Sequence, residues 1–353
     1  MKKITQRQLI IFYCIYSFAI KFLLLPQLLT RGAGNDAWIV ALVGTIIEIT
    51  VLHLVLRVLV LRKDSDISKI SLPHKSKFIP LFLIFLLQIM ILTKQSYYLL
   101  SENMFEDLSV YMFVIPMLML GIYLCFTSSR SIFRSGEIFY VFLIIGIAFS
   151  VFPSLGQINP REVLPVFSGG LTPILITTLF SLIYFESASF LLMFCGEIKI
   201  EENFQKKFMT TAVIVGVFFI FFVFMFWSLF GGVASSKNVA VANMTGYSSL
   251  MAQGGRTGWV LVSIWLLLLL LRFGITFFCA FKCIKYITGA KKCAGVISLS
   301  LAVTVLLLSA FVFAGMRDLE IFILSMRWVI LALYFAIPLW FFVGSKKEGA
   351  ENV

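Results

Sequence analysis

Apolar runs long enough to cross a membrane recur along the whole chain, and this feature constrains the fold more than any other. Charged residues make up only 13% of the 353 residues, against about 25% in soluble domains. A helix needs about 20 apolar residues to cross a hydrocarbon core of about 30 Å. We therefore predict an all-α polytopic membrane protein, a single membrane domain over 1–353 with about ten transmembrane helices. The predicted spans lie at about 8–29, 37–61, 78–101, 109–127, 133–153, 171–196, 208–231, 257–286, 293–314 and 319–343.

The net charge of +12 is explained by membrane topology. With the N-terminus placed inside, most of the 29 lysines and arginines fall in inside segments. The outside segments carry only Arg31, Arg161, Lys237, Arg256 and Arg317. We therefore expect both termini to be cytoplasmic, the basic inside segment 62–77 to contact anionic membrane lipid, and no nucleic-acid partner.

The spans divide into two groups of five on either side of the Pro- and Gly-rich segment 153–173. An odd number of spans per half places the halves in opposite orientations, which is the arrangement of inverted-repeat transporters. We expect a first repeat at about 8–153 and a second at about 171–343. The second contains a small, polar outer loop at 232–256, either a solvated connector or a cap that presents a surface to another protein.

In inverted-repeat transporters the first helix of each half is interrupted at the substrate site. The first interruption is expected between Lys21 and Pro26. The second is expected between Pro173 and Glu186, where the polar residues of FSLIYFES at 180–187 interrupt the apolar run.

Lys21 carries a charge in the middle of an apolar span, at a cost of about 2.5–3.5 kcal/mol. It must pair with a carboxylate or line a polar cavity. Because the two interruptions face each other near the membrane midplane in this type of fold, we predict an ion pair between Lys21 and Glu186. The pair either responds to a charged ligand that competes for one partner or simply holds two helices together. Snorkelling of Lys21 to the membrane surface is the remaining alternative.

A polar face is expected late in the third span. Lys94, Tyr97, Tyr98 and Ser101 have the spacing of one helix face. Such a face suits a water-filled cavity. The alternative is that the two tyrosines pack near the outer membrane interface.

Three further charges lie inside predicted spans, where ionisable groups are rare. Glu48 in the second span either forms a proton path with His53 or pairs with Arg272, Lys94 or a backbone group. Arg272 in the eighth span and Arg327 in the tenth are expected to be buried charges that form structural ion pairs, and the alternative for each is a contact with ligand.

The sequence contains no recognisable enzyme signature. Only two histidines are present, and no catalytic set of a nucleophile, a base and an acid stands out. No glycine-rich phosphate-binding loop stands out either. Cys279 and Cys283 are one helical turn apart, but no histidine or aspartate accompanies them. We predict no enzymatic activity, no cofactor and no metal.

A block after the first predicted span reads AGNDAW at 33–38 and is the most distinctive of several motifs. The others are ITQRQL at 4–9, LP at 25–26, RSGEI at 134–138, LPVF at 164–167, PIL at 173–175, FE at 185–186, Arg256, and IW at 264–265. Together they resemble the B, permease-like subunits of the spore germinant receptors, which belong to the amino acid–polyamine–organocation transporter superfamily.

The resemblance implies a LeuT-like 5+5 inverted-repeat fold with broken helices 1 and 6. It also implies a location in the inner membrane of a bacterial endospore, beside a germinant receptor A subunit and a C lipoprotein. The family usually has glycines at both breaks, where bare backbone can approach a ligand. Here Ala19, Lys21 and Tyr184 stand in their places, which predicts an altered pocket.

We predict a membrane-embedded germinant receptor subunit that senses a small, amino-acid-like germinant and relays a conformational change to its partners. The ligand is expected between the first, third, sixth and eighth helices. The alternatives are a proton-coupled amino-acid permease, using Glu186 or Glu48, and a structural subunit that binds no ligand. The predicted ligand-binding or gating residues are Ala19, Lys21, Phe22, Lys94, Tyr97, Tyr98, Ser101, Ser181, Tyr184 and Glu186.

Overall fold

The computed structural model describes residues 3–61, 78–103, 109–237, 239–247, 257–289, 293–312 and 316–351. Over these residues the regular structure is helical, and extended pairing is limited to an isolated bridge between Ile4 and Ile198. The basic segment 62–77, Arg256 and part of the outer loop 232–256 lie outside the described residues.

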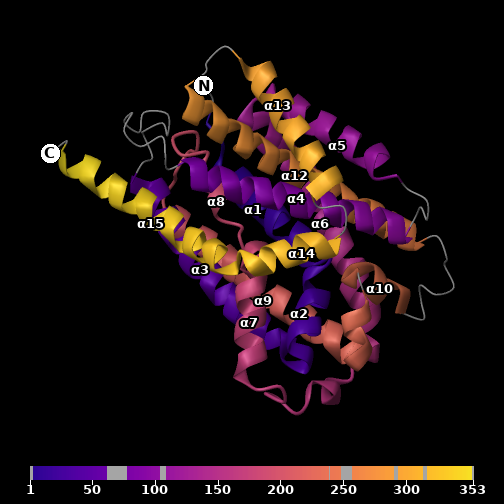
Figure 1. The fold of residues 1–353 in the computed structure, drawn as a ribbon. Coiled ribbons are helices and arrows are strands. Elements are labelled where there is room, and N and C mark those ends of the chain that lie inside the picture. The colour runs from indigo at the N-terminus through magenta and orange to yellow at the C-terminus, as the bar shows by residue number, and fades with distance from the viewer. Residues whose placement is uncertain are drawn as a thin grey trace.

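The helices follow the predicted spans in order (Figure 1). They are α1 (Gln6–Lys21), α2 (Leu25–Ala33), α3 (Ala37–Leu61), α4 (Phe78–Asn103), α5 (Val110–Cys125), α6 (Ser129–Val151), α7 (Leu171–Ser181), α8 (Ser189–Leu192), α9 (Phe204–Phe230), α10 (Ala240–Tyr247), α12 (Thr257–Thr288), α13 (Ala294–Leu307), α14 (Met316–Ser325) and α15 (Arg327–Glu351). Short helical turns include η1 (Gly34–Asp36), η6 (Leu182–Tyr184) and the π-helical η8 (Leu308–Val312).

The all-α membrane architecture is confirmed. Within the described residues, six helical stretches are long and apolar enough to cross a membrane. The bent pair α14 and α15 makes a seventh if it counts as one span. The helices α5 and α13 are apolar but shorter, so the ten-helix count stays a prediction.

The first predicted interruption is present. A capping box begins α1, in which Thr5 and Gln8 exchange side-chain to backbone hydrogen bonds. The helix ends at Lys21 and α2 begins at Leu25, so residues 22–24 interrupt the helical path. Pro26 lies in the first turn of α2, where its missing amide hydrogen costs no helical hydrogen bond.

The second predicted interruption is also present. The helix α7 ends at Ser181, η6 adds one tight turn, and residues 185–188 leave the helical path before α8 begins at Ser189. Both interruptions therefore place backbone groups without helical partners inside the protein, where they can bind other groups.

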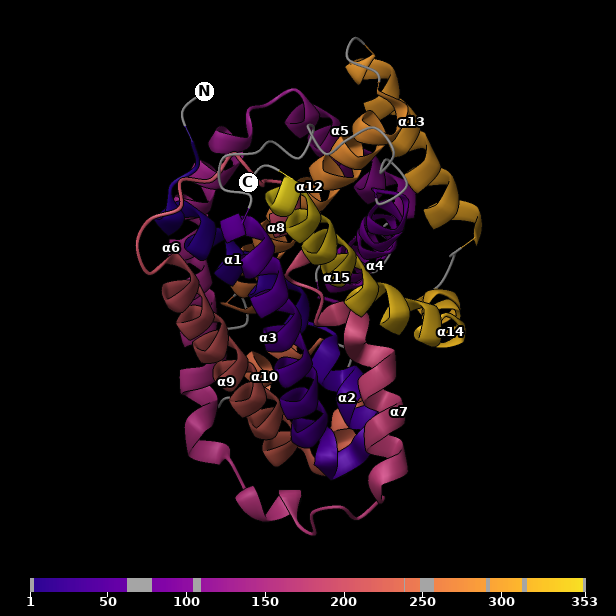
Figure 2. The same cartoon turned by 90° about the vertical axis from the view of Figure 1, so that its left-hand side faces the viewer.

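The central helices pack along one another. The helix α12 runs beside α4, and α15 crosses α3 (Figure 1). In Figure 2, α3 lies between α9 and α2, and α7 covers the other side of α2. The helix α1 packs against α6, α9 and α12, so polar side chains on its last turns must find partners inside the protein.

The AGNDAW block has a structural role at the loop between α6 and α7. The amide nitrogen of Asn35 donates to the carbonyl oxygens of Val163, at 3.2 Å, and Pro165. The hydroxyl of Ser168 donates to Asn35 Oδ1 at 2.7 Å. Asp36 Oδ1 accepts from the backbone amide of Phe167 at 2.8 Å. The most distinctive motif of the sequence thus fixes the loop rather than lining the buried charges described next.

Candidate functional site

Four charged side chains are buried in the middle of the helical body. None is more than 2% exposed, and they come from four different elements. Ionisable groups at membrane depth are costly, and they mark functional sites by default. The four are Lys21 at the end of α1, Glu48 on α3, Glu186 in the second interruption and Arg272 on α12. We call them the buried charge cluster.

Lys21 forms an ion pair with Glu48. Its ammonium also donates to Ser17 Oγ at 2.8 Å and lies 5.4 Å from the ring centre of Phe185. The predicted ion pair between Lys21 and Glu186 is wrong, as are the expected partners of Glu48. Side chains on a helix lean toward its N-terminus, so Lys21 reaches back one turn to Ser17 and across to α3.

Glu186 already has partners for both carboxylate oxygens. Its Oε1 accepts from the backbone amide of Ser189 at 2.7 Å, which caps the first turn of α8. Its Oε2 accepts from the amide nitrogen of Gln88 on α4. The same nitrogen lies 3.1 Å from the Glu186 carbonyl oxygen. These neutral donors hold the carboxylate in place without a lysine.

Arg272 joins the first, third, sixth and eighth predicted spans. One terminal nitrogen donates to the carbonyl oxygen of Tyr16 on α1. The other lies 3.3 Å from both Gln88 Oε1 and the carbonyl oxygen of Glu186. The guanidinium carbon stacks 3.9 Å from the centre of the Tyr16 ring. Arg272 is buried as predicted, but no carboxylate of the described residues is within ion-pair distance.

Within the part of the chain that the structure describes, the buried hydroxyl of Tyr184 in η6 lacks a hydrogen-bond partner. So do two polar atoms of the cluster, Glu48 Oε1 and Arg272 Nε. Buried polar groups in proteins are nearly always hydrogen-bonded, so each one calls for an explanation. The set offers one anionic acceptor and one cationic donor, the two groups that a zwitterionic ligand requires.

The polar face of α4 contacts the turn after α13. Lys94 is buried and donates to the carbonyl oxygen of Ser309 in η8 at 3.2 Å. Tyr97 and Tyr98 are half-buried and pack edge to face, with ring centres 5.6 Å apart. Ser101 is half-buried, and its hydroxyl lies 3.5 Å from the carbonyl oxygen of Tyr98. Lys94 thus contacts η8. It lies on α4, one to two turns after Gln88.

The remaining predicted residues pack in the interior around the interruptions. Ala19, Phe22 and Ser181 are at most 1% exposed. Phe22 stacks on Trp265 of α12, with ring centres 5.9 Å apart and planes 11° apart. The hydroxyl of Ser181 donates to a carbonyl oxygen of its own helix. At the first interruption, an aromatic stack therefore takes the space next to the helix end.

Arg327 was predicted to be a buried charge, but its side chain is less buried than that. It is half-buried, and it donates to the carbonyl oxygen of Leu324 at 3.1 Å. The helices α14 and α15 meet here at an angle of 65°. The bend frees carbonyl groups at the end of α14, and Arg327 satisfies one of them.

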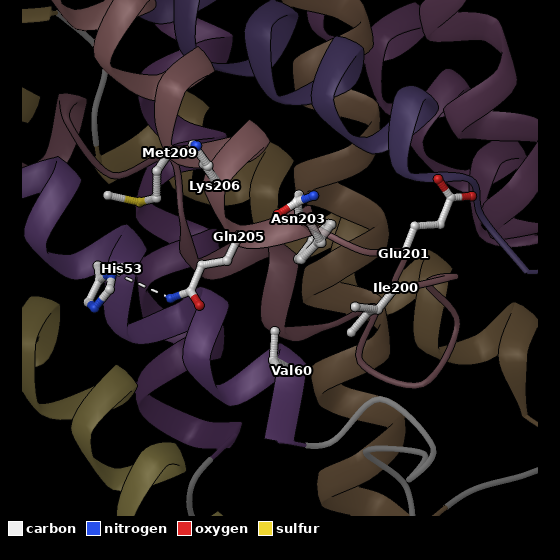
Figure 3. Close-up of a pocket in the computed structure, with 9 residues that line it drawn as sticks. His53, Val60, Ile200, Glu201, Asn203, Gln205, Lys206 and Met209 are labelled. Atoms are coloured by element: carbon white, nitrogen blue, oxygen red, sulfur yellow. Dashed lines mark hydrogen bonds between the residues drawn. The ribbon is translucent and has the colours of Figure 1, made fainter.

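His53 lines a pocket of about 530 Å³ between α3 and the start of α9 (Figure 3). Its Nδ1 is 3.4 Å from Gln205 Nε2, and Figure 3 shows Gln205 reaching toward it. The proton path from Glu48 to His53 stays a prediction. The pocket is lined by His53, Val60, Ile200, Glu201, Asn203, Phe204, Gln205, Lys206 and Met209.

Sequence reasoning missed Gln88 and Tyr16. Gln88 donates to Glu186 and accepts from Arg272 and from the hydroxyl of Tyr16, at 2.7 Å for the last. A signal for Gln88 was present, because it is the one polar residue in the run LFLIFLLQIMIL at 81–92. Tyr16 carries no such signal in a chain with 11 tyrosines.

A family model described as spore germination protein matches residues 3–314 of the chain. The chain belongs to the spore germination protein family. The match includes both interruptions and all four members of the buried charge cluster, whereas α15 lies beyond it. The resemblance expected from the motifs is thereby confirmed. No curated protein matches the chain.

This spore germination protein is accordingly a permease-like integral membrane protein of a family that is not a family of enzymes. The described residues contain no group of three or more histidine, cysteine, aspartate or glutamate side chains arranged to hold a metal ion. The contacts seen at the buried charge cluster are an ion pair and hydrogen bonds.

Proposed function

We propose that this protein is the membrane-embedded subunit of a germinant receptor and senses a small, amino-acid-like germinant at the buried charge cluster. The observation that carries the proposal is that an anionic acceptor and a cationic donor there both have a polar atom without a partner in the described residues. Among the residues that the structure describes, Glu48 Oε1 is an acceptor without a donor, and Arg272 Nε is a donor without an acceptor. Both belong to fully or nearly fully buried charges.

An amino acid carries the complementary groups. Its ammonium suits the free oxygen of Glu48, and its carboxylate suits Lys21 or Arg272. Separating Lys21 from Glu48 in the interior without replacement would be costly, because each charge would lose its partner. A zwitterion that enters between them gives each charge a new partner. Uncharged ligands lack this advantage, so we expect the site to prefer zwitterions.

The response follows from the position of the pair. Lys21 is the last residue of α1, and Glu48 lies on the neighbouring α3. A ligand that binds the separated pair better than the closed pair shifts the population toward the separated arrangement. We propose that partner subunits, a receptor A subunit and a C lipoprotein, detect this shift.

The membrane arrangement is part of the proposal. Ten transmembrane helices in two inverted repeats are supported by the helix order and by interruptions near corresponding positions of the two halves. The excess of basic residues on the segments that share the side of the N-terminus supports cytoplasmic termini. The membrane is proposed to be the inner membrane of a bacterial endospore.

The test uses Lys21→Glu, Glu48→Lys and the double exchange in spores, with germination measured across a panel of amino acids and uncharged analogues. A matched control exchanges Lys282 and Glu197, an ion pair of 2.6 Å outside the cluster. We expect the cluster variants to change which ligands act, or the concentration needed, by at least tenfold at equal protein abundance. If they change only abundance, as the control is expected to do, the protein is a structural subunit.

A proton-coupled amino-acid permease is the second candidate. The observation that favours it is a carboxylate, Glu48, buried at membrane depth beside an interrupted helix, since such groups carry protons in many transporters. Uptake of labelled amino acids into proteoliposomes distinguishes the two functions. Counterflow that is lost in Glu48→Gln would establish transport and would overturn a function limited to sensing.

A further inference from the structure

The guanidinium of Arg272 is enclosed by a cage of neutral oxygens. The cage consists of the carbonyl oxygens of Tyr16 and Glu186, the side-chain oxygen of Gln88 and the face of the Tyr16 ring. These groups come from α1, the second interruption and α4, whereas the guanidinium comes from α12. One side chain therefore contacts three other elements at once.

The cage matches the shape of a planar cation. A guanidinium carries donors around its edge and can stack by its face on an aromatic ring. Here the edge meets the three oxygens and the face meets Tyr16, at 3.9 Å from the ring centre. The carbonyl of Glu186 is available because residues 185–188 have left the helical path. The interruption thus supplies part of the cage.

Arg272 also determines how Gln88 is oriented. The Gln88 oxygen accepts from Arg272 and from the hydroxyl of Tyr16, which leaves its nitrogen to donate to the Glu186 carboxylate. A reversed amide would oppose its nitrogen to the donors of Arg272 and its oxygen to a carboxylate. Arg272 therefore positions Glu186 through Gln88 as well as through the backbone.

We propose that Arg272 is a positioning residue that holds α1 and the second interruption together, and that its cage binds a free guanidinium-type cation once the side chain is removed. This goes beyond the proposed function, because the cage requires no germinant. Only the germination measurement below rests on that function. The ligand class is a planar organic cation, selected by the three oxygens and the ring face.

The experiment measures the thermal stability of the purified full-length protein in detergent. Arg272→Ala removes the guanidinium, and Arg327→Ala is the matched control because Arg327 contacts a carbonyl outside the cage. Guanidinium chloride at tens of millimolar is compared with urea, which has the same shape without the charge, and with potassium chloride. We expect guanidinium alone to raise the melting temperature of Arg272→Ala, by about 2 °C at several times its Kd.

No guanidinium-specific rise in Arg272→Ala, or an equal rise in Arg327→Ala, would overturn the proposal. If Arg272→Ala does not accumulate in membranes, its yield becomes the measurement. We then expect a rise of at least threefold when cells grow with guanidinium but not with urea, and an equal yield in both overturns the proposal.

The same variants in spores separate this inference from the proposed function. We expect Arg272→Ala to lose at least tenfold in its germinant response and guanidinium to restore it. Thermal rescue without any effect on germination would leave the cage established and contradict the sensing function. Thermal failure contradicts the cage whatever the spores do.

Discussion

The buried pair of Lys21 and Glu48 makes a quantitative prediction about stability. Both side chains are almost fully buried, at 0% and 3% side-chain exposure. Removing one partner of a buried ion pair leaves an uncompensated charge and costs about 3–5 kcal/mol. We expect Lys21→Met and Glu48→Leu each to destabilise the protein near the lower end of this range. Lys21 keeps Ser17 and the Phe185 ring as partial compensation in the second variant.

The double variant is expected to behave differently. Replacing both members with apolar residues of similar size leaves no charge to desolvate, and such replacements are often neutral or stabilising. We expect Lys21→Met with Glu48→Leu to lie within about 2 kcal/mol of the wild type. The coupling energy between the two sites should therefore be at least about 4 kcal/mol.

The assay is a double-mutant cycle from reversible unfolding in detergent. The pair of Arg31 and Glu320 is the matched control, because its nitrogen and oxygen lie 3.4 Å apart and Arg31 is 62% exposed. An exposed pair of this kind couples by about 0–1 kcal/mol. Additive effects for Lys21 and Glu48, equal to those of the control, would refute the reasoning that the pair is desolvated and mutually dependent.

Three further changes test the surroundings of the site. Gln88→Leu is expected to destabilise by about 2–5 kcal/mol, measured by denaturant unfolding, because it leaves buried donors and acceptors on both Arg272 and Glu186 unpaired. Gly34→Ala should cost about 1–2 kcal/mol in the same assay, since Gly34 has a φ of 58° and L-residues avoid that region; an unchanged stability would contradict this. Arg327→Ala should cost less than about 1 kcal/mol, because one exposed hydrogen bond is lost, and a larger loss would show that the bend depends on it.

Much of the helix layout was predictable from local features. Run lengths of apolar residues located the helices because a chain in lipid must satisfy its own backbone hydrogen bonds. Pro26 and the polar FSLIYFES segment located the two interruptions, since proline and clustered polar residues disfavour continuing a helix through an apolar run. The buried state of Lys21, Glu48 and Arg272 followed from their position within those runs.

The partners of those charges were not predictable in the same way. Two carboxylates, Glu48 and Glu186, were chemically equivalent candidates for Lys21. The choice between them depends on how α1 is rotated toward α3 and on the amide of Ser189, which already holds Glu186. The rotation of a helix about its axis, and the contacts between segments far apart in the chain, are set only when the helices pack together. Gln88 and Tyr16 joined the site for the same reason, because each is ordinary in its own helix.

The sequence by itself thus determined the membrane class, the order of the helices and the two places where they break. Each of these depends on the balance between hydrocarbon burial and backbone hydrogen bonding within a short segment. Only the tertiary structure decided that Lys21 pairs with Glu48 and that Arg272 fills a cage of neutral oxygens. Those outcomes depend on which side chains come within about 3 Å of each other across helices far apart in the chain, and no local pattern encodes that distance.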